Sequence, residues 1–269
     1  MTAGEPTEGL AALAEAVAAA VPEVVSVVSL LDTGGASRAA RNDDGDDDGD
    51  ETLGDGPCRV LWGDERLRMH MGGYQFDVSA RSFFQTNTRQ GSTLVRIMQE
   101  ACGLKADGSE VLLDLYCGVG LLGISLARHC REVWGVELVE AAVQDATHNA
   151  ELNGVTNATF FQGDLGAVAA SLGTRIPPPD VVVVDPNRAG CRPALIAFLR
   201  QAAAATVVYV SCNPATQARD VRALCAPPDE GQPSSGQGAR YTLVSVTPVD
   251  MFPHTAHVET VAVLRRSDT

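Results

Sequence analysis

No apolar run in this 269-residue chain is long enough to cross a membrane as a helix. The first eight residues are acidic and lack a basic region that leads into an apolar stretch. We therefore expect no membrane partner, no secretory signal and no organelle transit peptide.

Paired cysteines are also missing. The chain has seven cysteines, an odd number at wide spacing, and no Cys-x-x-Cys pair. This pattern argues against a disulfide framework, a zinc ribbon and an iron–sulfur cluster. We expect free thiols and no metal, in a reducing intracellular compartment: the cytoplasm by default, with the nucleus or an organelle as alternatives.

Basic charge is scarce. The formal net charge is −14, and the tract DDGDDDGDE at 43–51 holds seven acidic residues and no basic one. Such runs are usually solvated and disordered. Charge alone gives no support for nucleic-acid binding, so an RNA partner would have to be held by local clusters of arginine.

The first 80 residues predict a small α+β segment. An alanine-rich stretch indicates a helix, and apolar, β-branched stretches indicate three strands. An insertion that contains Gly, Asp, Ser and Arg covers 32–56. The expected helix covers 10–20, and the expected strands cover 24–31, 58–63 and 74–80. We draw the boundary to a second, catalytic domain at residue 81, so that domain covers 81–269.

Strands and helices alternate in the second domain. The expected strands cover 110–118, 132–138, 158–164, 180–186, 206–212, 241–250 and 257–266, and the expected helices cover 88–102, 120–129, 140–153, 193–204 and 215–225. Fully apolar strands between helices predict an α/β fold, a parallel sheet covered on both faces. The last two strands leave no room for a helix, so we expect an antiparallel hairpin at one edge of this seven-stranded sheet.

A glycine loop follows the first of these strands. The stretch DLYCGVGLLG contains Gly118-x-Gly120-x-x-Gly123, and Glu137 ends the next strand. Glycines let the backbone approach a ligand, and an acidic residue at the second strand accepts hydrogen bonds from ribose hydroxyls. A nicotinamide dinucleotide and S-adenosyl-L-methionine (AdoMet) need the same features, so the loop alone does not separate them.

Three features favour AdoMet. Asp114 lies just before the glycines, where its carboxylate would repel a pyrophosphate but hold a cationic amino-acid end. Asp164 ends the third strand, where it is well placed for an adenine amino group. The edge hairpin fits methyltransferases and not dehydrogenases. We therefore expect a Rossmann-like, class I AdoMet-dependent methyltransferase, with an NAD-dependent dehydrogenase as the alternative.

Five segments occur in a fixed order along the chain: SFFQTNTRQ (82–90), LDLYCGVGLLGISLA (113–127), VVDPNRAGC (183–191), VSCNPATQARDV (210–221) and DMFPHTAHVETVAVL (250–264). Together they resemble the RNA uracil-5-methyltransferase family, which makes 5-methyluridine in tRNA or ribosomal RNA. The resemblance covers about 57–269, with a weaker echo in 10–31. Asn187 stands where members often have a second proline, a variant that resembles the plant-like branch.

The resemblance implies a covalent mechanism. Cys212 matches the nucleophile that adds to uracil C6, and Glu259 matches the base that removes the C5 proton. The turn at Asn213-Pro214 is expected to present the thiol at a helix start, which would lower its pKa.

Further residues match binding positions. Gln85, Tyr116 and Glu137 match cofactor contacts, and Asp185 is expected to touch the cofactor or the target uracil. The complete set of expected cofactor residues is Gln85, Asp114, Tyr116, Gly118, Gly120, Glu137, Asp164 and Asp185.

The target uracil must leave a stacked helix before it can react. Phe83 or Phe84 is a candidate to stack on a base, with Phe84 taken as the site residue, and one of the two is expected to pack in the core. Arg188 and Arg219 are the first candidates for phosphate contacts, followed by Arg81, Arg89 and Arg192.

The expected product is 5-methyluridine in RNA, in tRNA first and ribosomal RNA second. Many family members carry an N-terminal β-barrel that grips RNA, and this chain shows no such segment before residue 57. We expect either that the gripping part is missing or that the N-terminal segment and another partner replace it. A catalytically inactive RNA-binding or chaperone module with the same fold is the non-enzymatic alternative.

Overall fold

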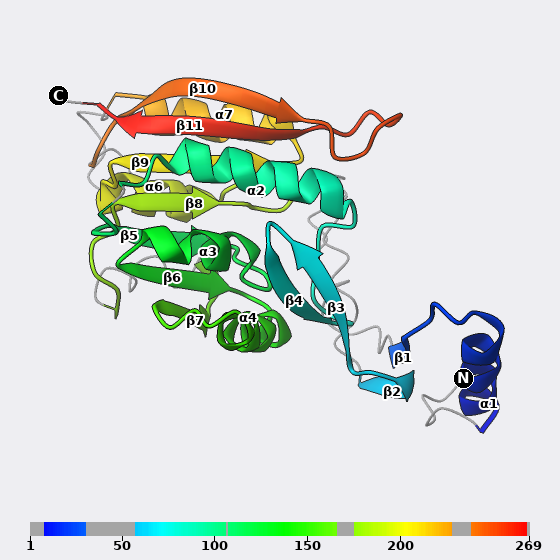
Figure 1. The fold of residues 1–269 in the computed structure, drawn as a ribbon. Helices are drawn as coiled ribbons and strands as arrows, with labels where there is room; N and C mark the ends of the chain where they lie inside the picture. The colour runs from blue at the N-terminus through cyan, green and yellow to red at the C-terminus, as the bar shows by residue number, and fades with distance from the viewer. Residues whose placement is uncertain (1–7, 31–56, 106, 166–174, 228–237, 268–269) are drawn as a thin grey trace.

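A seven-stranded sheet forms the centre of the molecule in the computed structural model, which describes residues 8–30, 57–105, 107–165, 175–227 and 238–267 (Figure 1). The acidic tract and the insertion at 32–56 lie outside the described residues. The strands of the sheet are β5 (Val111–Leu115), β6 (Glu132–Glu137), β7 (Ala158–Gln162), β8 (Val181–Val184), β9 (Thr206–Ser211), β10 (Tyr241–Val249) and β11 (Glu259–Arg266).

The strand order is β10-β11-β9-β8-β5-β6-β7. The five strands β5 to β9 pair in parallel, and β11 is antiparallel to both β9 and β10. The predicted α/β fold, with seven strands and an antiparallel C-terminal hairpin at one edge, is confirmed.

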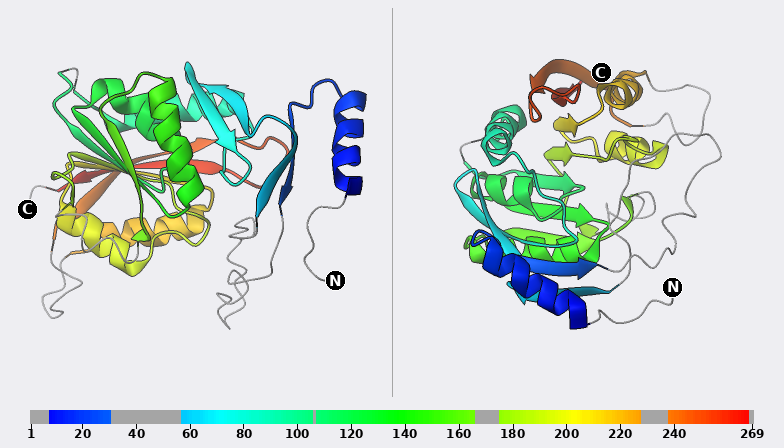
Figure 2. Two further views of the ribbon diagram at one scale, coloured as in Figure 1. Left: turned by 90° about the horizontal axis from the view of Figure 1, so that it is seen from below. Right: turned by 90° about the vertical axis from the view of Figure 1, so that its right-hand side faces the viewer.

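Helices cover both faces of the sheet (Figure 2). One face carries α2 (Thr88–Cys102), α3 (Leu121–Leu126) with a short 3₁₀ helix (Ala127–His129), and α4 (Glu140–Leu152); the other carries α6 (Pro193–Ala202) and α7 (Pro214–Cys225). Because β-strand side chains alternate, Val181 and Val183 pack under α2 and α3, whereas Val182 and Val184 pack under α6 and α7. Two apolar layers of this kind hold the sheet between its helices.

The N-terminal part consists of a helix, a two-stranded sheet and a hairpin: α1 (Glu8–Ala20), β1 (Ser26–Leu30) paired with β2 (Cys58–Gly63), and β3 (Arg66–Met71) paired with β4 (Tyr74–Ser79). The helix and β1–β2 lie to one side of the sheet (Figure 1). The strand β3 was not predicted from the sequence. Its residues RLRMHM alternate polar and apolar side chains, but only three of them are apolar and two of the others are arginines.

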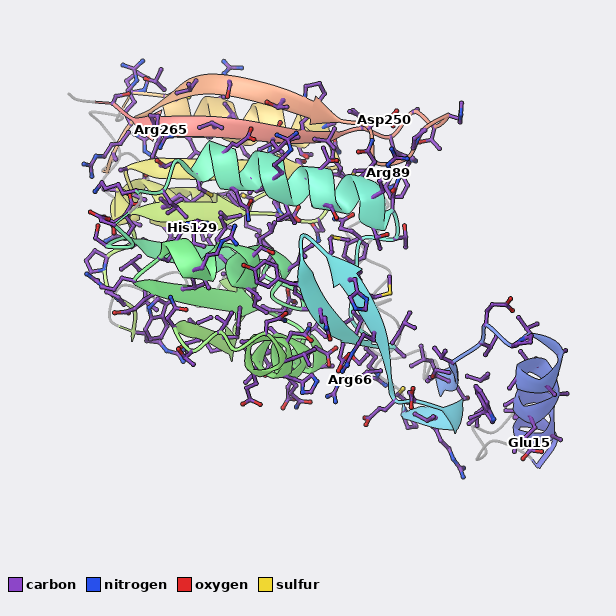
Figure 3. The ribbon with its side chains drawn as sticks, viewed as in Figure 1. Glu15, Arg66, Arg89, His129, Asp250 and Arg265 are labelled. Atoms are coloured by element: carbon purple, nitrogen blue, oxygen red, sulfur yellow. The ribbon has the colours of Figure 1, made fainter. Side chains whose placement is uncertain are left out.

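Buried hydrogen bonds dock the β3–β4 hairpin onto α4. The backbone N–H of Asp77 donates to Asn149 Oδ1 (2.7 Å), and Arg66, where the hairpin meets α4 (Figure 3), donates to Asp145 Oδ1 (2.9 Å). Asp145, which is 1% exposed, also accepts hydrogen bonds from the backbone of Ser79 and the hydroxyl of Ser82. The hairpin is therefore attached to the catalytic domain, and Asp145 anchors the loop that follows β4.

Candidate active site

The carboxyl ends of β5, β8 and β9 and the first residue of β11 meet at one edge of the sheet. Thr260 of β11 pairs with Ser211 of β9, so the next step of this antiparallel register places Glu259 beside Cys212. Asp185 directly follows β8, the neighbour of β9 on the other side. Three separate sequence motifs thus meet at this edge.

These side chains also lie on one face of the sheet. Val183, Val210 and Val261 belong to the core under α2 and α3, and a step of two residues from each leads to Asp185, Cys212 and Glu259. The electrostatic influence of both carboxylates on the thiol agrees with this placement. The structure therefore brings the expected nucleophile and the expected base together.

The Cys212 thiol is not activated by its helix in the way the sequence suggested. Burial raises its pKa, and the carboxylates of Glu259 and Asp185 raise it further, while the guanidinium of Arg188 lowers it. The expectation of a lowered pKa was wrong because α7 begins only at Pro214, and desolvation and two acidic neighbours outweigh the helix start.

Glu259 is a buried carboxylate. Burial raises its pKa, and Arg188 lowers it. Burial also raises the pKa of Asp185 to about 7, with Glu259 and Asp114 adding to the shift. Arg188 is thus a cation that acts on both the thiol and the base at this edge of the sheet.

The glycine loop begins with Asp114, which is 1% exposed. Its Oδ2 accepts a hydrogen bond from the backbone of Gly123 (2.9 Å), and its buried Oδ1 has no hydrogen-bond partner among the described residues. Burial raises its pKa to about 7, the Gly123 N–H lowers it and the charge of Glu137 raises it. Gly118 and Gly120 have φ values of +52° and +83°, which favour glycine, so the loop keeps its backbone open beside this carboxylate.

Glu137 and Asp164 lie beyond the loop. Glu137, the last residue of β6, accepts hydrogen bonds from the backbone of Gly118 (3.1 Å) and of Val139 (2.9 Å), so it holds the glycine loop. Asp164, which follows β7, forms an ion pair with Arg192 at 3.7 Å. Both carboxylates stand where the sequence placed them, and their contacts with a cofactor stay predictions.

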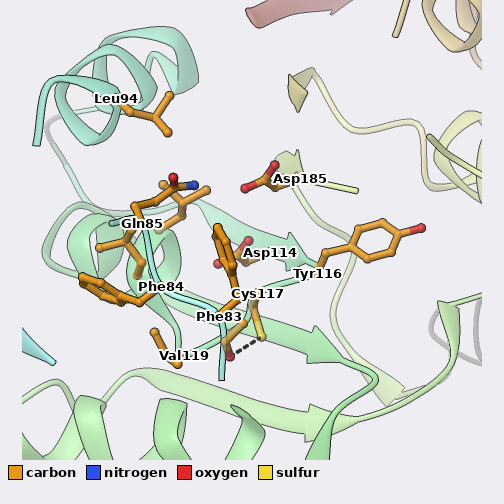
Figure 4. A pocket seen from close by; sticks show the side chains of 12 residues that line it. Phe83, Phe84, Gln85, Leu94, Asp114, Tyr116, Cys117, Val119 and Asp185 are labelled. Carbon is orange, nitrogen blue, oxygen red and sulfur yellow. Dashed lines mark hydrogen bonds between the residues drawn. The ribbon is translucent and has the colours of Figure 1, made fainter. Parts of the chain in front are cut away.

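A pocket joins the glycine loop to the loop after β4 (Figure 4). Gln85, Asp114 and Asp185 line the same space, and the ring of Tyr116 extends away from them. Tyr116 has a φ of +63°, and its ring packs with the core under α6 and α7. We therefore expect Tyr116 to contact a cofactor through its backbone more than through its ring. The complete lining is Phe83, Phe84, Gln85, Leu94, Asp114, Tyr116, Cys117, Gly118, Val119, Leu121, Leu122 and Asp185.

The two phenylalanines of the loop after β4 have different surroundings. The ring of Phe84 packs on Phe76 with 5.6 Å between centroids, whereas Phe83 is 72% exposed. Phe84, which the sequence suggested as the base-stacking residue, is thus the one that packs against the core. The exposed ring of Phe83 is the better placed of the two to stack on a base.

Arg188 belongs to the loop after β8, residues 186–191, and Arg219 of α7 contacts this loop. The Arg188 side chain is exposed, and its carbonyl accepts hydrogen bonds from Asn213 Nδ2 (3.2 Å) and Thr216 Oγ1 (3.1 Å). Arg219 donates to Asp220 Oδ1 (2.9 Å) and to the carbonyl of Ala189 (2.8 Å). Arg219 is therefore already engaged in holding this loop. Sequence analysis missed its partner Asp220.

Within the described ranges, no helix combines the length and the apolar character that a bilayer requires. Over the same residues, no group of three histidine, cysteine or acidic side chains is suited to hold a metal ion. All seven cysteines lie in the described part of the chain, and all are free.

Comparison with known proteins supports the family resemblance. Residues 62–165 match the family model described as tRNA (uracil-5-)-methyltransferase. The resemblance to the RNA uracil-5-methyltransferase family that the motifs predicted is confirmed over these residues.

Bacterial relatives extend this similarity over most of the chain. A protein named only as an RNA methyltransferase in Porphyromonas gingivalis is 38% identical over 257 residues, which are 95% of this chain and 50% of the relative. Another from Halalkalibacterium halodurans is 43% identical over 209 residues, 77% of this chain and 42% of the relative. The chain spans about half the length, or less, of these relatives.

Solved structures agree with the family. The crystal structure of Pyrococcus abyssi tRNA (uracil-54, C5)-methyltransferase in complex with S-adenosyl-L-homocysteine matches with a TM-score of 0.63 and 36% identity, over 79% of this chain and 47% of that one. Trm5b from the same organism matches at 14% identity, with a TM-score of 0.59 over 98% of this chain and 71% of that one. The second match concerns the fold alone, and both fit the class I methyltransferase architecture.

Proposed function

We propose that this chain transfers a methyl group from AdoMet to C5 of a uridine in RNA, in tRNA first and ribosomal RNA second. The main support is the meeting of the Cys212 thiol with the buried carboxylate of Glu259 at the end of β9 and the start of β11. The relatives named as RNA methyltransferases support the broader activity, and the family match supports uracil C5 as the target.

The pocket residues fit AdoMet. The unpartnered Asp114 Oδ1 is a buried acceptor suited to the ammonium group of a bound amino-acid moiety, whose charge would favour the ionised carboxylate. The open glycine loop and Gln85 border the same pocket, with Glu137 and Asp164 at the ends of the next two strands. When bound there, AdoMet supplies an electrophilic methyl carbon on a sulfonium.

Cys212 makes uracil C5 reactive. The C5 of uracil is a weak nucleophile, so the thiolate first adds to C6, and the electron pair of the C5=C6 bond moves toward C5 and the C4 carbonyl oxygen. Arg188 supports this step because its positive charge lowers the pKa of Cys212 against two acidic neighbours. It also offsets the negative charge that the thiolate brings to the site.

Glu259 completes the reaction. After C5 has gained its methyl group it still carries a hydrogen, and the Glu259 carboxylate removes this proton. The C–H electron pair restores the C5=C6 bond, the C6–S bond breaks, and Cys212 leaves as a thiolate. The raised pKa of Glu259 makes it a stronger base than an exposed glutamate. Because the cycle begins and ends with a free thiol, we place it in a reducing compartment.

RNA in which the target position is 5-fluorouridine tests this mechanism. Fluorine at C5 cannot leave as a proton, so addition and methyl transfer should stop at a covalent protein–RNA adduct. We expect a band resistant to denaturing electrophoresis that contains the Cys212 peptide and forms only with AdoMet. The control Cys212→Ala should form none.

Two outcomes would contradict the proposal. An adduct that persists in Cys212→Ala would assign the nucleophile elsewhere. If the protein binds AdoMet but transfers labelled methyl to no uridine-containing RNA, the result would favour the inactive RNA-binding module. Glu259→Gln should accumulate the adduct on ordinary uridine, which separates the role of the base from that of the nucleophile.

A further inference from the structure

A buried carboxylate outside the proposed reaction lies behind the site. Asp220, in α7, is 2% exposed. Its Oδ2 accepts hydrogen bonds from the backbone N–H of Cys191 (2.7 Å) and from the hydroxyl of Tyr209 (2.7 Å), and its Oδ1 accepts one from Arg219 Nε (2.9 Å). Three donors from three parts of the chain therefore meet on one carboxylate.

These bonds close the loop after β8 onto α7. Gly190 has a φ of +78°, and a Cβ at this position would lie 2.5 Å from Asp220 Oδ2, so the backbone of the loop rests directly on the carboxylate. Arg219, which Asp220 orients, also donates to the carbonyl of Ala189. The loop thus depends on Asp220 at two backbone positions, directly at Cys191 and through Arg219 at Ala189.

The same loop carries Arg188 toward the reacting edge. The Arg188 carbonyl accepts hydrogen bonds from Asn213 and Thr216, which belong to the turn and helix that follow Cys212. The charged groups that act on the Cys212 thiol are Glu259, Asp185 and Arg188, and only the arginine favours the thiolate. A displaced loop would leave the thiol with its two acidic neighbours.

We propose that Asp220 is a positioning residue: it anchors the loop after β8 and so holds Arg188 beside Cys212 and Glu259. This deepens the function proposed above, since it concerns the same thiol. All three partners donate to the carboxylate, whereas an asparagine would turn an NH₂ group toward either the Arg219 guanidinium or the Cys191 N–H. Either placement loses one of the two links between Asp220 and the loop, so the loop would shift.

Two matched variants of the 269-residue chain test the proposal. Asp220→Asn disturbs the bonds that hold the loop, whereas Tyr209→Phe removes one bond to the same Oδ2 and leaves those of Cys191 and Arg219. Iodoacetamide alkylation of Cys212, followed by peptide-resolved mass spectrometry from pH 6 to 10, reports the thiolate. We expect the pH midpoint to rise in Asp220→Asn, with alkylation at pH 8 slowed about threefold or more, because one pKa unit is about a tenfold change in thiolate.

Tyr209→Phe should leave this midpoint unchanged, although both variants lower the melting temperature. Arg188→Gln should raise the midpoint as Asp220→Asn does, and the double variant should shift it no further. Gly190→Ala, which pushes the loop off the carboxylate by a different route, should also raise it and serves where Asp220→Asn does not fold. The proposal would be overturned if the midpoint stayed unchanged in both Asp220→Asn and Gly190→Ala. It would also be overturned if the shifts of Asp220→Asn and Arg188→Gln added up in the double variant.

Alkylation needs neither RNA nor AdoMet, so this readout is independent of the proposed function. A raised midpoint in a protein that methylates no RNA would support the role of Asp220 and reject the function. In an active protein, Asp220→Asn should lower kcat for methyl transfer while the KM for AdoMet stays within about twofold, since the loss acts on the thiolate and not on cofactor binding.

Discussion

Asp114 combines a functional charge with a burial cost. Its pKa is raised to about 7, so between about pH 4 and pH 7 the folded protein holds a proton that the unfolded chain releases. The carboxylate therefore lowers stability progressively as pH rises through this window, and the loss is complete above it. Asp114→Asn should match the wild type near pH 4 and be more stable at pH 8, by up to about 1.4 kcal/mol for each pKa unit of the shift.

The same variant should bind AdoMet much more weakly, because an amide cannot neutralise an ammonium group. Urea unfolding of the ligand-free protein at pH 4.5, 6 and 8 measures the first effect, and calorimetric titration with AdoMet measures the second. A stability gap that is independent of pH would show that Asp114 is ionised throughout and that its burial has been offset by another group.

The proposed function predicts a pH dependence of catalysis from the two residues expected to react. Both Cys212 and Glu259 have raised pKa values, and both must be ionised in the free enzyme. kcat/KM for methyl transfer should therefore increase from pH 6 upward and level off only above the pKa of Cys212, with no acidic optimum. In Arg188→Gln the whole curve should move to higher pH. A bell-shaped profile with a maximum below pH 7 would contradict these assignments.

Single residues also show where sequence reasoning stopped. The motifs identified Cys212, Glu259 and Asp114 because reacting groups stand at strand ends, and the register then brings them to one edge. The ring direction of Tyr116 depends on a left-handed backbone angle, which the sequence does not reveal for a tyrosine. Asp145 is a helix residue whose partners come from a segment 63 to 79 positions away, so no local pattern marks it as an anchor.

At the scale of elements, Asn87 joins α2 to the segment that leads into Glu259. Its Oδ1 caps the helix by accepting a hydrogen bond from the backbone of Gln90 (3.1 Å), and its Nδ2 donates to the carbonyl of buried Met251 (2.9 Å). Asn87→Asp should keep the cap and lose the bond to Met251, and Asn87→Ala should lose both. We expect Ala to be less stable than Asp by about 1 kcal/mol.

Both Asn87 variants should lose methyl-transfer activity to a similar extent, because both release the segment before Glu259. Urea unfolding and single-turnover methylation measure the two effects separately. Full activity in Asn87→Asp would show that the bond to Met251 is not needed to place the base.

Helices and strands were predicted correctly where apolar residues dominate, and a strand was missed where contacts with other elements stabilise it. The run VVVV of β8 and the helices between strands follow from local pattern, and so does the edge hairpin, from the short distance between its strands. The strand β3 has only a half-apolar sequence and is stabilised by pairing with β4 and by the bond from Arg66 to Asp145. The partner strand β4 is local, joined through Gly72 and Gly73, but the bond to Asp145 spans 79 positions and exists only in the folded chain.

At the scale of the whole molecule, the N-terminal part consists of two pieces with different contacts, a division that the sequence did not predict. The helix α1 and strands β1 and β2 contact chiefly one another, and they leave several apolar side chains exposed: Leu10, Leu13, Val17, Val21 and Trp62. The β3–β4 hairpin instead buries Phe76 and bonds to Asn149 and Asp145 of α4. By these contacts, the hairpin packs as part of the catalytic domain, although the sequence suggested a boundary at residue 81.

Two truncations test where the catalytic domain begins. Removal of residues 1–64 should leave a folded protein whose AdoMet affinity is within about threefold of the full chain, since the site and the hairpin are intact. Removal of residues 1–80 takes Phe76 from the core, worth about 3–5 kcal/mol. It also removes the bonds of Arg66 and Ser79 to buried Asp145 and of Asp77 to Asn149 Oδ1, so these two buried residues lose donors at about 1–3 kcal/mol each. For a domain of this size we expect a melting temperature lower by about 10 °C or more.

Differential scanning calorimetry and AdoMet titration of both truncations provide the measurement. The longer truncation should also lose AdoMet binding. It removes Ser79 of β4, which bonds to both Asp145 and Ser82, so the loop that carries Phe83 and Gln85 would move. Equal stability and equal affinity of the two truncations would instead place the boundary at residue 81 and make the hairpin a passive attachment.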